Sequence, residues 1–299
     1  MANLGDLVVR KSYGGDITFR VELIEHNKAI IKGTEFRLLA DAPLTDLVKV
    51  PADSTGEKAQ RAQIKASESL QRLNQARQQQ VERNRAALSQ EWYTQGEEPS
   101  YFEVPGKVLH LDGDKRYLEK SLQLYQKLRV PVNGYYITES TMSSALYQLL
   151  PSIQPDIVVI TGHDGVLKNR PSSDLYNLNS YKNSSHFVEA VRTARQYERN
   201  FDALTIVAGA CQSHFEALLQ AGANFASSPS RILIHALDPV YIAAKASLTS
   251  VRETIHVSDV LNNTISGTQG MGGIETRGSY RIGLPKLQDL STLKVVPSM

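Results

Sequence analysis

Ile157-Val-Val-Ile-Thr-Gly-His163 and Leu204-Thr-Ile-Val-Ala-Gly-Ala-Cys211 are the two apolar stretches that decide the fold of this chain. Each has the composition of a buried β-strand, and each ends in a residue that can take part in catalysis. The spacing between His163 and Cys211 fits one right-handed strand-helix-strand crossover, which would bring both residues to the carboxyl edge of one parallel sheet. A cysteine beside a histidine at such an edge is the chemistry of a thiol protease.

The alternation of apolar strands and helical segments continues on both sides of these stretches, from Pro105 onward. It predicts a parallel sheet covered by helices on both faces, a three-layer α/β domain whose ligand site lies at the carboxyl ends of the strands. The predicted strands are Lys107–Leu111, Val132–Ile137, Asp156–Thr161, Leu204–Ala208 and Arg231–Ala236. The predicted helices cover residues 114–128, 140–150, 184–198 and Ser213–Ala221, and a further one begins at Pro239.

The first 51 residues contain short clusters of β-forming residues between turn residues, which predicts a small β-barrel resembling the SH3 type. Such a barrel can bind a peptide, a nucleic acid or another domain, or serve only as a packing module, and the sequence leaves these alternatives open. The predicted strands are Leu7–Val9, Thr18–Ile24, Ala29–Ile31, Phe36–Leu39 and Leu47–Val50.

A segment rich in Gln, Ala, Arg, Lys and Glu follows the barrel and predicts a long, exposed, weakly amphipathic helix over Ser54–Trp92. It is basic but has no aromatic residues among the basic ones, so a solvated spacer is favoured over an arm that binds nucleic acid or a partner. The predicted parts are the barrel (1–51), the basic helical spacer and linker (52–104), the α/β domain (105–288) and a tail (289–299).

The composition predicts a large folded core and argues against several function classes. The chain has 299 residues, of which 41% are hydrophobic and 21% charged, and its formal net charge of +2 gives no argument for a nucleic-acid partner. Neither a secretory signal nor an apolar run of about 18 residues is seen, so a cytoplasmic protein without a membrane span is expected. A single cysteine argues against an internal disulfide or a cysteine-based zinc site, and no metal or cofactor is expected.

Cys211 is the predicted nucleophile. Gly209 and Ala210 permit a sharp turn before it, and the helix predicted from Ser213 would direct its first N–H groups at the sulfur. A helix amino terminus lowers the pKa of a thiol and so favours the thiolate. The same N–H groups, together with that of Cys211, could bind the oxyanion of a tetrahedral intermediate.

His163 is the predicted general base. It ends an apolar strand between Gly162 and Gly165, where the backbone is permissive and the ring is expected to be exposed at the sheet edge. The sequence leaves open which group orients the imidazole, since the side chain next to it in sequence can also point away. The candidate carboxylates are Asp164, Asp112 and Asp114.

The remaining histidines are rivals or accessories. His214 is near Cys211 in sequence, but helical geometry would turn it toward the packing face, so a structural or hydrogen-bonding role is favoured. His186 starts a predicted helix and is a weaker candidate for a cap or a substrate contact. His235 with Asp238 forms the remaining rival pair.

Six further segments stand out: Pro105–Asp114, Val159–Asp164, Ala208–Phe215, Gly222–Arg231, His235–Tyr241 and Gly272–Gly278. Together they resemble the YabG family of sporulation-specific cysteine proteases from spore-forming Firmicutes. The similarity also includes Gly5–Ser12, so it spans nearly the whole chain apart from the helical spacer and the extreme end. The resemblance implies a protease made during sporulation that processes spore coat, cortex-associated and related spore proteins, in the mother cell and associated with the forming coat.

The strand-His, crossover, strand-Cys order also resembles the caspase, clostripain and gingipain group of cysteine proteases, of the clan CD type. This resemblance implies a caspase-like domain with His163 as base and Cys211 as nucleophile. One departure is Asp164, where that group has a glycine whose amide contributes to the oxyanion hole, so the donor here is expected from Asp164 or Gly165. The clostripain-like members also imply cleavage after basic residues. The candidates for substrate contact are Asp114, Asp164 and Asp238 as an acidic lining, with His186 and His214.

Two hypotheses from other function classes stay open. In the first, the domain is an amidotransferase-like hydrolase that uses Cys211 with His235. In the second, the chain is a non-enzymatic spore assembly factor that binds through its barrel and basic helix. Self-cleavage of the protease within that helix is a further hypothesis, because bonds such as Arg83–Asn84 and Arg85–Ala86 follow basic residues in an exposed segment. A homodimer is also left open.

Overall fold

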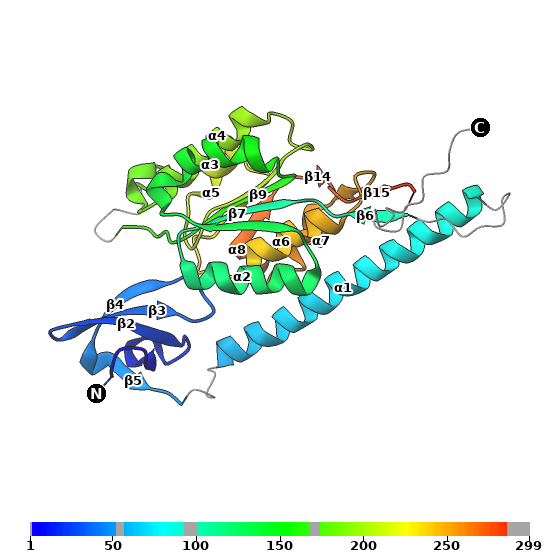
Figure 1. Ribbon diagram of the computed structural model, residues 1–299. Helices are drawn as coiled ribbons and strands as arrows, with labels where there is room; N and C mark the ends of the chain where they lie inside the picture. The colour runs from blue at the N-terminus through cyan, green and yellow to red at the C-terminus, as the bar shows by residue number, and fades with distance from the viewer. Residues whose placement is uncertain (1, 52–56, 93–100, 168–173, 286–299) are drawn as a thin grey trace, which may run out of the picture.

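The computed structural model describes residues 2–51, 57–92, 101–167 and 174–285. The predicted tail and parts of the predicted linker lie outside these residues. Within them, the chain forms a mixed α/β structure with an antiparallel sheet at the N-terminal end and a larger, mostly parallel sheet at the centre (Figure 1). A long helix joins the two in sequence.

The central sheet has six strands in the order β13-β11-β10-β9-β7-β8. Neighbouring strands are parallel except for β13, which is antiparallel to β11. The predicted parallel sheet is therefore confirmed. The strands are β7 (Val108–Asp112), β8 (Val132–Tyr136), β9 (Ile157–Thr161), β10 (Thr205–Ala208), β11 (Phe225–Ser227) and β13 (Met271–Gly273).

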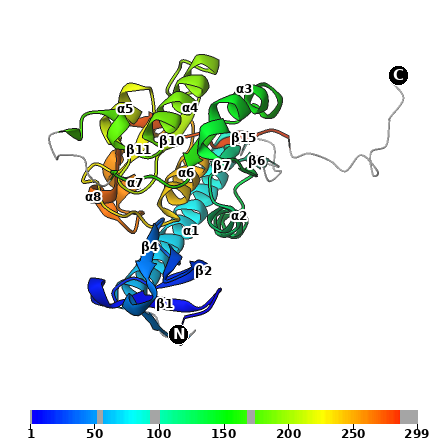
Figure 2. The same cartoon turned by 90° about the vertical axis from the view of Figure 1, so that its left-hand side faces the viewer.

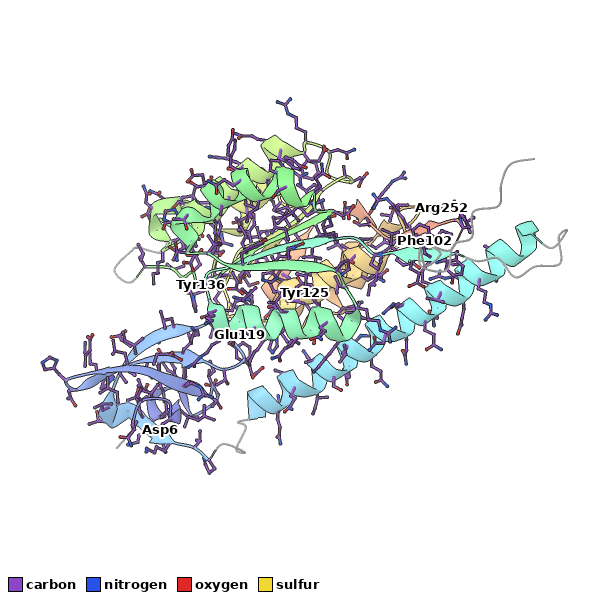
Figure 3. The ribbon with its side chains drawn as sticks, viewed as in Figure 1. Asp6, Phe102, Glu119, Tyr125, Tyr136 and Arg252 are labelled. Carbon is purple, nitrogen blue, oxygen red and sulfur yellow. The ribbon has the colours of Figure 1, made fainter. Side chains whose placement is uncertain are left out.

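Helices cover both faces of this sheet, because its middle strands are apolar on both sides. In β9, Val158 and Ile160 pack in the core beneath one helical layer, whereas Ile157 and Val159 pack beneath the other. The first layer contains α3 (Met142–Ile153), α4 (Ser184–Tyr197) and α5 (Phe215–Gln220), and the second contains α2 (Lys115–Leu128) and α6 (Asp238–Leu248). Tyr125 of α2 lies between that helix and the sheet (Figure 3) and contacts His110 of β7 at 3.1 Å.

Small elements complete the domain and bring distant parts of the chain together. The pair β6 (Phe102–Val104) and β15 (Arg281–Gly283) joins its beginning to its end, and a second pair consists of β12 (Thr254–Ile255) and β14 (Thr276–Arg277). Two short helices, α7 (Val257–Leu261) and α8 (Gly267–Gly270), precede β13.

The N-terminal sheet has five antiparallel strands in the order β4-β3-β2-β1-β5. Alternate side chains such as Val8, Phe19 and Ile31 form its core, as the period of a strand requires. The carboxyl ends of β7 and β9 lie at the end of the α/β domain that is nearer this sheet (Figure 1), and Figure 2 shows the sheet below that domain. Its strands are β1 (Leu7–Arg10), β2 (Phe19–Glu25), β3 (Lys28–Gly33), β4 (Leu39–Pro43) and β5 (Leu47–Lys49).

Two predicted strands are wrong, and they contact each other. Residues 34–38 form a loop between β3 and β4, where the sequence predicted a strand over Phe36–Leu39. The predicted strand Arg231–Ala236 stays outside the central sheet, whose next strand after β10 is β11. Instead, Phe36 and His235 form an antiparallel bridge. The β-forming residues of these two segments therefore form a contact between the N-terminal loop and the edge of the α/β domain.

The long helix α1 (Glu57–Trp92) exists as predicted, but it is not a free spacer. It packs along α2 and α6, and Ala62 and Leu73 on its inner face are almost fully buried. The buried stripe also contains Ser69 and Gln80, and these polar residues explain why the sequence indicated an exposed helix. None of the helices in the described ranges is long and apolar enough to span a membrane.

Candidate active site

His163 and Cys211 lie just beyond the ends of two adjacent strands. β9 and β10 pair in parallel and in register. The alignment continues past their ends, because the Thr161 hydroxyl donates a hydrogen bond to the Gly209 carbonyl at 2.9 Å. The two residues thus occupy equivalent positions at one carboxyl edge, as the strand pattern predicts.

Cys211 is buried, with 1% of its surface exposed. Its sulfur accepts a hydrogen bond from the Ile234 N–H at 3.2 Å and lies 3.8 Å from the Ile234 carbonyl oxygen. Burial raises the pKa of this thiol to about 12, and the Ile234 N–H offsets only part of the shift. Cys211 is therefore a protonated thiol in this structure.

The helix after Cys211 does not lower the pKa of the thiol, contrary to the prediction. α5 begins only at Phe215, and its cap is His214, whose Nδ1 accepts a hydrogen bond from the Ala217 N–H at 3.3 Å. The residues between form a turn in which the Ser213 hydroxyl accepts from the Ala210 N–H at 2.9 Å. This turn separates the cysteine from the first helical N–H groups, so burial decides the pKa.

His163 faces two carboxylates. Its Nε2 lies 3.3 Å from Asp114 Oδ2, and its Nδ1 lies 3.9 Å from Glu139 Oε1. Burial lowers the pKa of His163 to about 4, although the charge of Asp114 opposes the shift. The imidazole is therefore neutral near pH 7 and able to accept a proton.

Asp114 connects this histidine to the N-terminal sheet. Its Oδ1 caps α2 by accepting hydrogen bonds from the N–H groups of Arg116 and Tyr117 at 2.9 and 3.1 Å. Its Oδ2 forms an ion pair with Lys32 of β3. The sequence offered Asp114 both as an orienting group and as a substrate contact, and this geometry favours the orienting role.

Glu139 is a site residue that the sequence analysis missed. It starts the short 3-10 helix η3 (Glu139–Thr141) after β8, and its carboxylate accepts a hydrogen bond from the His163 N–H at 2.8 Å. Gly113 and Gly162 permit this approach, because a Cβ on either would overlap the carboxylate. A glycine just after each of two neighbouring strands is the signal in the sequence that could have indicated a close contact there.

Asp164 does not orient the imidazole. Its carboxylate accepts hydrogen bonds from the Asn183 N–H at 2.8 Å and from the hydroxyls of Ser184 and Ser213. The carboxylate also accepts a hydrogen bond from the Gly165 N–H at 2.9 Å. This bond engages one of the two amides that were expected to bind an oxyanion. Asp164 therefore ties the loop after β9 to α4 and to the turn that follows Cys211.

Asp112, at the end of β7, pairs with Arg37 of the N-terminal loop and not with His163. Two hydrogen bonds of 2.9 and 2.8 Å join the guanidinium to the carboxylate, and both side chains are fully buried. Burial alone would raise the pKa of Asp112, but the charge of Arg37 and the hydrogen bonds from His110 and Arg37 together outweigh it and hold the pKa well below its usual range. The sequence analysis did not single out Arg37.

Comparisons with known proteins identify the family. The family described as YabG peptidase U57 matches residues 3–285 of the chain. The chain belongs to this family. It is also 48% identical over 290 residues to the sporulation-specific protease YabG of Bacillus subtilis (strain 168). The alignment covers 94% of this chain and 97% of the B. subtilis protein. No solved structure matches the chain.

Two of the predicted accessory histidines lie on the helical layer that contains α4 and α5. His214 caps α5, and its Nε2 lies 3.0 Å from the Tyr176 carbonyl oxygen, which agrees with a structural role. His186 is half-buried in the first turn of α4, where its N–H donates to the Asn183 carbonyl at 3.0 Å. Substrate contacts by either residue stay predictions.

The rival pair, His235 and Asp238, is engaged in other contacts. His235 Nδ1 accepts a hydrogen bond from the Leu237 N–H at 3.2 Å, and its Nε2 lies 3.4 Å from the Glu35 carboxylate. The Asp238 carboxylate is fully buried and accepts the Ile265 N–H at 2.7 Å. Burial raises the pKa of Asp238. Asp238 is thus a buried connection between segments and does not line an open pocket.

Proposed function

We propose that this YabG-family peptidase is a cysteine endopeptidase, with Cys211 as nucleophile and His163 as general base. The observation that supports the proposal is the placement of the two residues at equivalent positions beyond adjacent parallel strands. Cys211 is the single cysteine of the chain, so no other thiol can take this role. Both residues come from one chain, and the site therefore needs no second copy.

The chemistry follows from the protonation states of the pair. The neutral imidazole of His163 accepts the proton of the Cys211 thiol while the sulfur bonds to the carbonyl carbon of the scissile peptide. The resulting imidazolium donates this proton to the leaving amine as the C–N bond breaks. Water, deprotonated by His163, then hydrolyses the thioester and restores the thiol. Asp114 stabilises the transient imidazolium, and Glu139 fixes the backbone of His163.

The oxyanion that forms during attack is proposed to bind the Cys211 N–H. Of the two amides that the wider protease group suggested, those of Asp164 and Gly165, the Gly165 N–H is less suitable because it is bound by the Asp164 carboxylate. The nearby His163 N–H is also engaged, by Glu139. Binding at the nucleophile's own amide keeps the donor on the same turn as the sulfur.

A caspase-like architecture is proposed for the α/β domain. A mostly parallel sheet with helices on both faces, and a histidine and a cysteine after neighbouring strands, supports it. For the N-terminal sheet we propose an SH3-like barrel, supported by its five short antiparallel strands around one core.

The proposed substrates are spore coat and related spore proteins, because the B. subtilis relative is named a sporulation-specific protease. Cleavage after basic residues is proposed from the likeness to clostripain, and Asp112 and Asp114 supply negative charge at the site edge. The proposed place of action is the mother cell, on the forming coat.

The experiment that tests this function uses spore coat extract and four purified proteins: wild type, Cys211→Ala, His163→Ala and His235→Ala. Mass spectrometry of the fragments is expected to show new carboxyl termini after Arg or Lys with wild type and none above background with Cys211→Ala or His163→Ala. Full cleavage by Cys211→Ala would exclude the thiol mechanism. Activity retained in His163→Ala but lost in His235→Ala would favour the amidotransferase-like alternative.

A further inference from the structure

The loop between β3 and β4, residues 34–38, lies beside the proposed nucleophile and turns tightly at Arg37, where the Leu38 N–H donates a hydrogen bond to the Phe36 carbonyl at 2.7 Å. Arg37 N–H donates a hydrogen bond to the Ile234 carbonyl at 3.4 Å, and Ala236 N–H donates to the Glu35 carbonyl at 2.8 Å. Phe36 forms the antiparallel bridge between these two bonds. The loop is therefore held to residues 234–236 of the α/β domain by one isolated antiparallel bridge.

Main-chain pairing of this kind is how many proteins hold an extended peptide. Here it takes place beside the nucleophile, because Ile234 is the residue whose N–H bonds to the Cys211 sulfur. Burial raises the pKa of this sulfur, and the Arg37 backbone N–H, which bonds to it, acts in the opposite direction. The main chain of Arg37 thus lies next to the thiol. In a peptidase, this is the position that the substrate residue beside the scissile bond has to occupy.

The side chain of Arg37 fills a closed pocket. Besides its two hydrogen bonds to Asp112, the guanidinium donates to the Ala236 carbonyl at 3.1 Å and lies 4.9 Å from the centre of the Tyr117 ring. A planar cation that bonds to a carboxylate in this two-point manner and stacks on an aromatic ring is specific for arginine. The end of β7 and the start of α2 therefore form a pocket with the shape and charge for a basic side chain.

Side chains of the α/β domain hold the rest of the loop. The Tyr117 hydroxyl lies 2.6 Å from the Gly33 carbonyl oxygen and 2.7 Å from that of Phe36. Lys120 donates to the Thr34 carbonyl at 2.6 Å and pairs with Glu35 at 3.0 Å. Beyond Phe36, a pocket of about 650 Å³ opens along Ile232, Leu233 and α1. The loop thus fills the space beside Cys211 with Arg37, while Phe36 lines an open cavity.

We propose that the loop of residues 34–38 is an internal occupant of the substrate groove, with Arg37 in the pocket for the basic residue that precedes the scissile bond. This proposal rests on the proposed function. In the resting protein the loop covers Cys211, and an incoming chain with a basic residue has to displace it. The N-terminal sheet therefore controls access to the nucleophile.

The test measures access to Cys211 by alkylation with iodoacetamide and intact-mass spectrometry, which is unambiguous because the chain has one cysteine. Arg37→Ala is expected to be labelled at least about tenfold faster than wild type at pH 8, since the open state becomes the main one. Glu35→Ala, which removes the contacts to Lys120 and His235 from a less buried position, is expected to accelerate labelling as well. Arg10→Ala, which breaks an ion pair with Asp46 within the N-terminal sheet, is the matched control and keeps the wild-type rate.

Circular dichroism melts establish that each variant is folded at the labelling temperature. If both folded loop variants are labelled at the wild-type rate, the proposal is overturned. A peptide copy of residues 34–37 with a fluorogenic amide after the arginine separates the two proposals. Faster labelling together with faster release of the fluorophore in Glu35→Ala supports both. Faster labelling with no release by any variant keeps the loop as a cover and contradicts the cysteine peptidase mechanism.

Discussion

Arg37 and Asp112 form a fully buried ion pair with two hydrogen bonds, and it joins the N-terminal loop to the end of β7. A buried charge that loses its partner is strongly unfavourable, whereas a pair replaced as a whole is not. The pair therefore links the position of the loop to the stability of the site, and it leads to the first prediction.

Asp112→Ala is expected to lower the free energy of unfolding by about 3 to 5 kcal/mol, because it leaves the Arg37 guanidinium buried without a counter-charge. The double variant Arg37→Met with Asp112→Leu should recover most of this loss, since no charge stays buried. Urea denaturation measures both values. Lys28→Ala, which breaks a largely exposed pair with Asp41, is the control and should change stability by less than about 1 kcal/mol. A double variant as unstable as Asp112→Ala would contradict the argument.

Asp114→Asn is expected to reduce kcat on the order of a hundredfold, because it removes the charge that stabilises the His163 imidazolium in the transition state. Asparagine can still cap α2, so the fold should persist. Asp164→Asn is the contrasting variant. It should lower the melting temperature through its lost loop contacts while kcat stays near that of wild type. Peptide hydrolysis measures both, and equal losses of kcat would show that the two carboxylates were assigned wrongly.

The protein is expected to lose stability as the pH falls from 6.5 to 4. In this range an unfolded His163 binds a proton, whereas the buried side chain, with a pKa of about 4, does not. The unfolded state thus binds more protons, and the free energy of unfolding falls by at most about 1.4 kcal/mol per pH unit for this group. Burial also lowers the pKa of His110, which adds a decline of the same sign.

Denaturant titrations at several pH values measure this slope. His163→Gln should reduce it without abolishing it, because His110 remains. His256→Gln serves as the control. His256 is exposed, and its contact with Glu275 raises its pKa. A raised histidine pKa has the opposite effect on the slope, so this variant should not reduce the slope. An unchanged slope in His163→Gln would mean that His163 titrates normally in the folded protein.

The alkylation rate of wild-type Cys211 is expected to rise about tenfold per pH unit from pH 7 to 10, with no plateau, because its pKa is about 12 and only the thiolate reacts. When the loop is loosened in Glu35→Ala, water reaches the sulfur and the plateau should move to lower pH. Stopped-time mass spectrometry gives the profiles. A plateau below pH 9 in wild type would contradict a closed, desolvated thiol.

Self-cleavage within α1 is expected to be slow and to depend on Cys211. The bonds Arg83–Asn84 and Arg85–Ala86 lie inside a helix that packs on the α/β domain, and a peptidase that binds extended chains requires this helix to unwind locally. Wild type incubated for days should yield fragments that end at these arginines, while Cys211→Ala stays intact. Equal fragmentation of both proteins would point to a contaminating protease.

The fold could be predicted well where a short, continuous run of apolar residues forms a whole strand. The runs that became β7, β9 and β10 are buried on both faces, and this makes a parallel-sheet strand visible in the sequence alone. The two segments that were wrongly predicted as strands, residues 36–39 and 231–236, are also rich in β-forming residues. They contact each other outside the predicted sheets. β-forming residues specify an extended segment, and the partner of that segment is a tertiary property.

The site shows the same division. The positions of His163 and Cys211 at the ends of adjacent strands followed from one-dimensional spacing. Their surroundings did not, because the helix start near Cys211 and the close approach of Glu139 depend on turns and on glycines that permit contact. The predicted low pKa of the thiol was wrong for the same reason: burial by other segments, which the sequence did not reveal, outweighs any nearby N–H.

The sequence by itself determined the sheet that carries the pair, since strand and crossover are encoded by periodic, short-range patterns. Only the tertiary structure decided which carboxylate faces His163, and that an arginine from the N-terminal loop is buried beside Cys211. Arg37 and Asp112 come from different sheets, and their pairing has no periodic signature in the chain. Charge pairing and burial arise from three-dimensional contact, and in this protein they set the protonation state of both proposed catalytic residues.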